Sequence, residues 1–198
     1  MPVSHVPLPE GRLPTRYSVE TRWLHWLTAL MVLVQFALGE TWGFLPRGTA
    51  VRAGMTMTHT SVGVLLAATP LTRIVWAVTG GRAIRFPVRN LSDQVARLVH
   101  WLLYVMLGAE IAVGYMLRWS RGRPVMAFGV PINSPFADMG VGVQRIFGQC
   151  HYWLAWGLTM VAACHAMAAL SHAIICRAGV LPRMLPARGY AAGSVTDL

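Results

Sequence analysis

The sequence predicts an all-α integral membrane protein, a four-helix bundle, and three observations support this prediction. Of the 198 residues, 55% are hydrophobic and only 12% are charged, whereas a soluble domain carries about a quarter charged residues. The apolar residues gather into four long stretches, each close to the roughly 20 residues that cross a bilayer as a helix. No internal repeat or second soluble domain interrupts them, so we expect one bundle with short loops.

The four expected helices are residues 23–45, 55–79, 94–119 and 147–176. The first is not a cleaved signal peptide, because it is long, lacks a small-residue cleavage site and carries His25. Pro70 is expected to kink the second helix, which membrane helices tolerate. The bundle domain should cover residues 16–186, between a proline-rich flexible tail at residues 1–15 and a C-terminal tail at residues 187–198.

The basic residues indicate how the bundle is oriented. All 17 are arginines, and the formal net charge is +10. If the N-terminus is cytoplasmic, 11 arginines fall on the inner segments and 6 on the outer loops, and an excess of arginine marks the cytoplasmic side. We therefore expect a multi-pass protein in membrane lipid with both termini cytoplasmic. The arginines lie mostly between apolar runs, so topology explains them better than a nucleic-acid partner, and none is expected.

Four histidines recur at matched depths on three of the expected helices. His151 and His165 are 14 residues apart, which turns a helix by roughly 1400° and advances it by about 21 Å, so they share one face at two depths. His59 lies near the outer start of the second helix, at the depth of His151. His25 lies near the inner start of the first, at the depth of His165. Ionisable residues inside a membrane segment are functional-site candidates by default.

Two cross-helix histidine pairs about 20 Å apart suit two stacked bis-histidine haems better than a small metal site. A structural zinc site needs about four clustered ligands, whereas haem iron takes two axial ligands on opposite faces of a wide ring. No C-x-x-C-H motif occurs, so covalent haem attachment is not expected. Gly39 and Gly63 fall on the bundle-facing sides of their helices and would let a macrocycle approach, although glycine is also frequent in ordinary membrane helix contacts. A hydrogen-bonded packing role or a proton path is the alternative for any single intramembrane histidine.

The inner pairing is open to one alternative. His172 lies seven residues past His165, about 10 Å deeper toward the cytoplasm, and its distance from the flanking arginines would also suit a partner of His25. We prefer His165, because a fourth helix that protrudes from the membrane removes the conflict. His172 with Ser171, and His100 on the third helix, then become candidates for hydrogen bonds to a quinone or to haem propionates.

Several short stretches carry a family resemblance. They are RYSVETRWLHW at residues 16–26, HTSVG at 59–63, HWLLY at 100–104, AFGVP at 127–131, HYWLAWGLTMVAACHAMAALSH at 151–172 and RMLP at 183–186. With them the chain resembles the bacterial cytochrome b-561 family, whose members include superoxide oxidase. The histidine layout is also similar to that of the membrane cytochrome b subunits of nickel–iron hydrogenases and formate dehydrogenases, but the AFG and RMLP stretches favour the b-561 branch.

The resemblance implies a four-helix protein of the bacterial inner membrane with two haem b groups. The matching ligand positions are His25 with His165, and His59 with His151. It also implies electron exchange with ubiquinone. In the superoxide oxidase branch, superoxide is oxidised to oxygen at the periplasmic side, and the electron passes through both haems to quinone. The expected function is therefore a relay of single electrons between a periplasmic donor, superoxide by preference, and ubiquinone.

Arginines at the helix ends are candidates for contacts with haem propionates. They are Arg22 and Arg73 on the inner side, and Arg52 and Arg145 on the outer side. The outer loops carry six arginines against Glu40 and Asp138, a net charge of +4, which would steer an anion such as superoxide. Solvated loop charge or contact with lipid headgroups explains this charge nearly as well. The chain has no lysine, so lysine-dependent features of the superoxide oxidase branch do not carry over.

Two other functions stay open. The chain could be the electron-transfer subunit of a partner dehydrogenase or hydrogenase, or pass electrons to a cytochrome c, although its short loops leave little surface for docking. A non-redox transporter could instead use histidines and Glu110 as a polar path, and would show no haem absorbance. Glu110 lies in the middle of the third helix, where it would relay protons or hydrogen-bond within the bundle, and we favour the hydrogen bond.

Overall fold

The computed structural model describes residues 18–79, 91–175 and 181–184. The long helices are α1 (Val19–Thr41), α2 (Ala50–Thr79), α3 (Leu91–Trp119) and α4 (Val141–Ile174). The short elements are a 3-10 turn η1 (Trp42–Phe44), strands β1 (Val125–Ala127) and β2 (Val130–Ile132), and helix α5 (Leu181–Met184). The two tails expected from the sequence lie outside the described residues.

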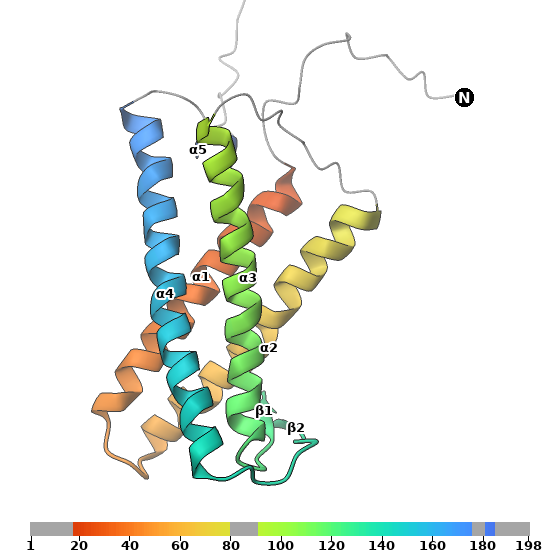
Figure 1. Ribbon diagram of the computed structural model, residues 1–198, viewed down its shortest axis with the longest axis vertical. Coiled ribbons are helices and arrows are strands. Elements are labelled where there is room, and N and C mark those ends of the chain that lie inside the picture. Colours follow the sequence, from red (N-terminus) through yellow and green to blue (C-terminus); the bar gives the residue numbers. More distant parts are fainter. Residues whose placement is uncertain (1–17, 80–90, 176–180, 185–198) are drawn as a thin grey trace, which may run out of the picture.

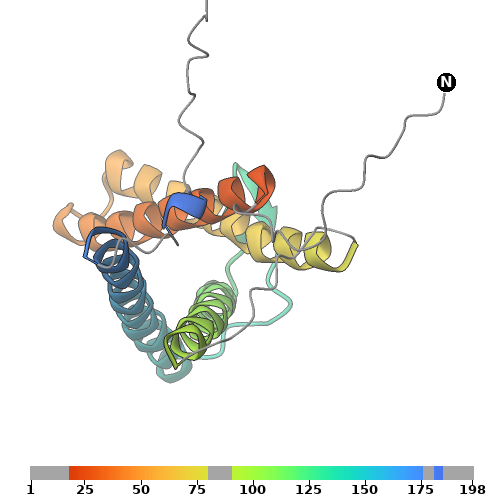
Figure 2. The same ribbon diagram turned by 90° about the horizontal axis from the view of Figure 1, so that it is seen from above.

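The long helices form two pairs, with α1 packed along α2 and α3 packed along α4. Seen from above, α1 and α2 lie together in one layer, and α3 and α4 lie on one side of that layer (Figure 2). Each long helix contributes one side chain to a small buried core, which consists of Met31, Leu66, Leu107 and Leu158. The strands lie at one end of the bundle and α5 at the other (Figure 1), and we call these the hairpin end and the α5 end.

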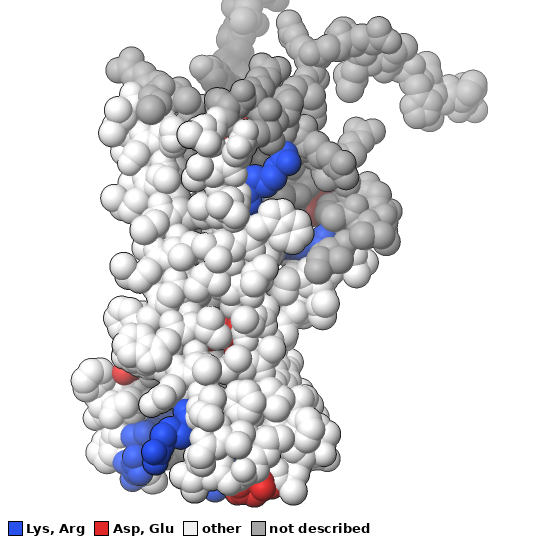
Figure 3. All heavy atoms as spheres, in the orientation of Figure 1, with Lys and Arg blue, Asp and Glu red and all other residues white. Residues whose placement is uncertain are grey.

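The described residues include three segments that are long and apolar enough to cross a membrane. They are Val19–Phe44, Leu91–Trp119 and Val141–Ile174, with 26, 29 and 34 residues. Only 6% of the most apolar window in each is buried inside the protein, so their large apolar side chains face outward. Trp23, Trp101 and Trp153 are 72%, 66% and 69% exposed. An outward apolar surface of this extent indicates contact with lipid. On the face drawn in Figure 3, charged side chains gather toward the two ends and nearly vanish between them.

The helix order is as expected, but the helix boundaries differ. Helix α4 begins at Val141 instead of residue 147, directly after Gly140, whose φ of 85° suits glycine. Helix α2 continues through Pro70, although proline has no N–H to give to the carbonyl of Leu66. The Thr69 hydroxyl donates to that carbonyl at 2.9 Å instead, which is how membrane helices accommodate proline.

A two-stranded hairpin between α3 and α4 was not expected from the sequence. Strands β1 and β2 pair antiparallel around Phe128 and Gly129, which have φ angles of 51° and 84°, as a tight two-residue turn requires. The hairpin is anchored to α2, because Thr60 donates to the Met126 carbonyl at 2.8 Å and Ser61 accepts from the Phe128 amide at 2.9 Å. The hairpin therefore packs against α2 at this end of the bundle, and its turn lies within the AFG stretch.

Candidate functional site

The hairpin end brings His59 of α2 and His151 of α4 together. Their ring centroids are 6.1 Å apart and their planes are nearly perpendicular, at 87°. Both rings line a cavity of about 380 Å³, which lies within the size range of ligand and cofactor sites. The lining residues used below come from all four long helices and are Gln35, Gly39, His59, Gly63, Glu110, Gly114, Arg118 and His151. Bonds between a metal and an imidazole nitrogen are about 2 Å long, so a centroid distance of 6.1 Å is compatible with one metal atom between the two rings.

Three glycines make space around this cavity. A Cβ on Gly114 would lie 3.1 Å from Cε1 of His151, and one on Gly39 would lie 3.8 Å from Cε1 of His59. A Cβ on Gly63 would come within 2.9 Å of the Gln35 amide nitrogen, which no side chain tolerates without a shift. Because Gly114 and Gly63 have no Cβ, the side chains of His151 and Gln35 can occupy their observed positions. Gly39 and Gly63 face the interior of the bundle, as expected from the sequence.

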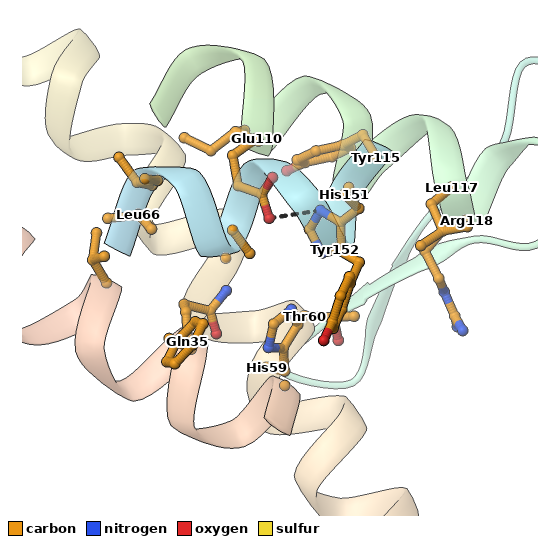
Figure 4. A pocket seen from close by; sticks show the side chains of 18 of the residues that line it. Gln35, His59, Thr60, Leu66, Glu110, Tyr115, Leu117, Arg118, His151 and Tyr152 are labelled. Carbon is orange, nitrogen blue, oxygen red and sulfur yellow. Dashed lines mark ion pairs between the residues drawn. The ribbon is translucent and has the colours of Figure 1, made fainter. Parts of the chain in front are cut away.

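Glu110 of α3 is the charged partner of His151. Its Oε1 lies 2.8 Å from Nδ1 of His151, and Figure 4 shows the two side chains pointing toward each other across the top of the cavity. The contact lacks the alignment of a hydrogen bond, since Nδ1 of His151 has no hydrogen-bond partner among the described residues. Glu110 was expected to interact within the bundle, and the structure shows that it contacts His151.

Four further buried polar atoms at this end also lack hydrogen-bond partners in the described part of the chain. They are Oε1 of Gln35, Nδ1 of His59, Oε2 of Glu110 and Nε of Arg118. A buried polar atom left without a hydrogen bond costs about 1–3 kcal/mol, so such atoms in a native protein call for an explanation, often a ligand or water. Here they face a cavity lined by two imidazoles.

Toward the α5 end, three described histidines lie near one another instead of two. The rings of His100 and His165 make an edge-to-face contact with centroids 4.9 Å apart, and His25 is close enough to interact electrostatically with both and with Arg73. Nδ1 of His100 lies 2.6 Å from the Ala96 carbonyl. Because a carbonyl only accepts, this nitrogen carries the hydrogen and Nε2 keeps its lone pair.

His172 stands apart from these three rings. It lies in the last turn of α4, and its side chain is exposed, as is that of Ser171. The structure therefore places His165 rather than His172 in the group with His25, while His172 and Ser171 form part of the outer surface of α4.

The four arginines that the sequence suggested as contacts for haem propionates lie in different environments. Arg73 stacks over the Tyr104 ring at 5.3 Å, and Arg22 lies one turn before His25 on α1. Arg52 donates to the Leu45 carbonyl at 2.7 Å. Arg145 lines a separate hollow beside α4 and is not among the residues that line the main cavity.

Sequence reasoning missed Gly114 and Arg118. Glu110, Gly114 and Arg118 follow one another at intervals of four residues on α3, so they share one helix face. This spacing could have identified Gly114 and Arg118 from the sequence. Arg118 is half-buried, its Nε makes no hydrogen bond within the described residues, and it lines both the main cavity and a cleft under the hairpin that Arg52 also lines.

The donor set suits haem better than a bare metal ion. Within the described ranges, no three histidine, cysteine or carboxylate side chains are placed to hold a metal ion. Haem needs only two axial protein ligands because its macrocycle supplies the other bonds. Two imidazoles that face each other across an apolar, glycine-lined cavity fit that requirement.

Comparison with known proteins agrees with this chemistry. Residues 16–187 match the family model described as prokaryotic cytochrome b561. Cytochrome b561 homolog 2 of Escherichia coli (strain K12) is 32% identical over 175 residues, which cover 87% of this chain and 92% of that protein. Probable superoxide oxidase CybB of Yersinia pestis is 27% identical over 179 residues, with 86% and 96% covered. Cytochrome b561 homolog 1 of Escherichia coli (strain K12) is 29% identical over 175 residues, with 87% and 98% covered.

Proposed function

Because the chain belongs to the prokaryotic cytochrome b561 family, we propose that it is a dihaem cytochrome that relays single electrons from superoxide to ubiquinone across the inner membrane. Family membership makes it a membrane electron-transfer protein of a family that binds b-type haem, and the donor, the acceptor and the number of haems are our proposal. The observation that carries it is the His59–His151 pair, 6.1 Å apart across a cavity at one end of the bundle, with a second histidine group at the other end.

The four long helices all cross the bilayer in this proposal, with the hairpin end periplasmic and both termini cytoplasmic. His59 and His151 hold the periplasmic haem b, and His25 and His165 hold the cytoplasmic one. When bound, haem supplies reversible one-electron redox chemistry. The chain holds and orients the two groups at different depths and keeps water away from them by surrounding them with apolar helices.

Superoxide enters at the hairpin end. Arg118 lines both the cleft under the hairpin and the histidine cavity, and Arg121 lines the cavity as well, so positive charge leads from the surface to the site. Such charge raises the local concentration of an anion. One of the similar proteins is named a probable superoxide oxidase, which supports superoxide as the donor.

Ubiquinone is reduced at the α5 end. In this proposal, His172, Ser171 and Nε2 of His100 supply groups that hydrogen-bond to quinone oxygens, and Arg73 and Arg22 neutralise haem propionates near His25. Each superoxide gives up one electron and becomes oxygen, so two superoxide ions and two protons convert one ubiquinone to ubiquinol. The protons come from the cytoplasmic side, where the quinone binds.

The first test is a reduced-minus-oxidised spectrum of the purified protein with haem quantification, followed by an assay with superoxide and ubiquinone alone. We expect two b haems per chain and ubiquinol formation without a partner protein. Two haems without that activity would favour an electron-transfer subunit of a dehydrogenase or hydrogenase. A folded protein that takes up no haem would contradict the proposal and leave a transporter with a polar path through Glu110.

A further inference from the structure

The carboxylate of Glu110 forms an ion pair with one histidine in the described part of the chain. It reaches from α3 to α4, and its Oε1 is 2.8 Å from Nδ1 of His151, with the two side chains only 14% and 24% exposed. His151 is its single charge partner in the described part of the chain. A mid-helix acid in a membrane span is costly unless it is paired, so this pairing accounts for its presence.

The contact determines which nitrogen of His151 is available. A carboxylate oxygen attracts the N–H at Nδ1, so Nε2 keeps the lone pair that a metal needs. Gly114, one turn further along α3, lies so close to Cε1 of the same ring that a Cβ would be 3.1 Å away. Glycine and glutamate on one face of α3 therefore limit the position of this ring and favour the tautomer that carries its hydrogen on Nδ1.

The α5 end has no equivalent device among the described residues. His100 gives its Nδ1 hydrogen to a backbone carbonyl, which is a weaker acceptor than a carboxylate. The charged group beside His25 is Arg73. A carboxylate on a ligating histidine makes the ring a stronger electron donor and so favours the oxidised metal, whereas a nearby cation disfavours the extra positive charge of that state.

We propose that Glu110 is a positioning residue that, through His151, holds the hairpin-end haem at a lower reduction potential than the α5-end haem and so gives the relay its direction. This inference rests on the proposed function. Electrons move toward the higher potential, so the order favours transfer from the superoxide side to the quinone side.

The test is a redox titration of the full-length protein with Glu110→Gln, which keeps the shape of the side chain but weakens the acceptor. We expect both haems to remain and the lower potential to rise, with the equilibrium for electron transfer between the haems shifting by about tenfold, or about 59 mV for one electron. The potential that moves should be the one that disappears in His59→Ala. Glu110→Asp, which keeps the charge but shortens the reach, should shift it in the same direction.

The matched control is Glu40→Gln, which removes a carboxylate that lines the same cavity but forms no ion pair with a histidine in the described part of the chain. Its two potentials should shift less than those of the Glu110 variants. Unchanged potentials in both Glu110 variants, movement of the higher potential, or an equal shift in Glu40→Gln would each overturn the inference. Failure of the proposed function looks different, because the wild-type protein would then lack two haems or form no ubiquinol from superoxide. Circular dichroism shows whether each variant is folded.

Discussion

The two ends of the bundle use the same side chain in different surroundings. At the hairpin end, two histidine rings stand 6.1 Å apart across a cavity, and a carboxylate holds one of them. At the α5 end, His100 and His165 are in contact at 4.9 Å, a normal spacing for packed rings, and His25 lies nearby. At the hairpin end the two proposed ligands therefore line one cavity and a carboxylate holds one of them, whereas at the α5 end the proposed ligand His165 packs against His100, which is not a proposed ligand. The difference shows that the groups around a ligating histidine, as much as the histidine itself, decide how well a site is arranged to bind a cofactor.

The largest expected effect tests the two ends directly, by removing one proposed haem ligand from each end. His59→Ala should lose the hairpin-end haem, and His165→Ala should lose the α5-end haem, because iron keeps only one axial ligand in each case. Haem quantification should fall from two to about one per chain in either variant. His172→Ala is the control and should keep both haems. If His172→Ala lost a haem and His165→Ala did not, the α5-end pairing would be wrong.

The next effect concerns Arg118, which lines both the histidine cavity and the cleft under the hairpin. Arg118→Gln should lower the rate constant for superoxide by about tenfold at low salt, because electrostatic steering typically contributes 10-fold or more. The difference from wild type should shrink as ionic strength rises. The measurement is stopped-flow haem reduction by superoxide at two or more salt concentrations. Arg145→Gln, outside the cavity, should have a smaller effect, and equal effects would show that only the overall charge matters.

A smaller effect is expected for the hairpin, which has no counterpart among the described residues of the α5 end. Ser61→Ala removes the acceptor for the Phe128 amide, and Ser61 is 5% exposed. The loss should destabilise the fold by about 1 kcal/mol and lower the thermal midpoint of the purified protein. Thr58→Ala, an exposed position on the same helix, is the control. A midpoint as high in Ser61→Ala as in Thr58→Ala would mean that the hairpin is not anchored by this bond.

Much of the fold could be predicted from the sequence because helices in a membrane are specified locally. Apolar runs of sufficient length located all four long helices, although the ends of α2 and α4 extend beyond the apolar residues. The hairpin could not be predicted in this way, since its three-residue strands carry no periodic signal and its turn places Phe128, rather than asparagine or glycine, at a positive φ. The family resemblance, drawn from the same motifs, is confirmed by the family match.

The sequence by itself determined which residues share a helix face. The 14-residue spacing puts His151 and His165 on one side of α4, because the pitch of an α-helix is fixed by its own backbone. Only the tertiary structure decided what each of them meets: His59 and Glu110 at one end, His100 and His25 at the other. These partners depend on how far each helix is rotated and shifted against its neighbours. That is a property of side-chain packing across the bundle, which no single helix contains.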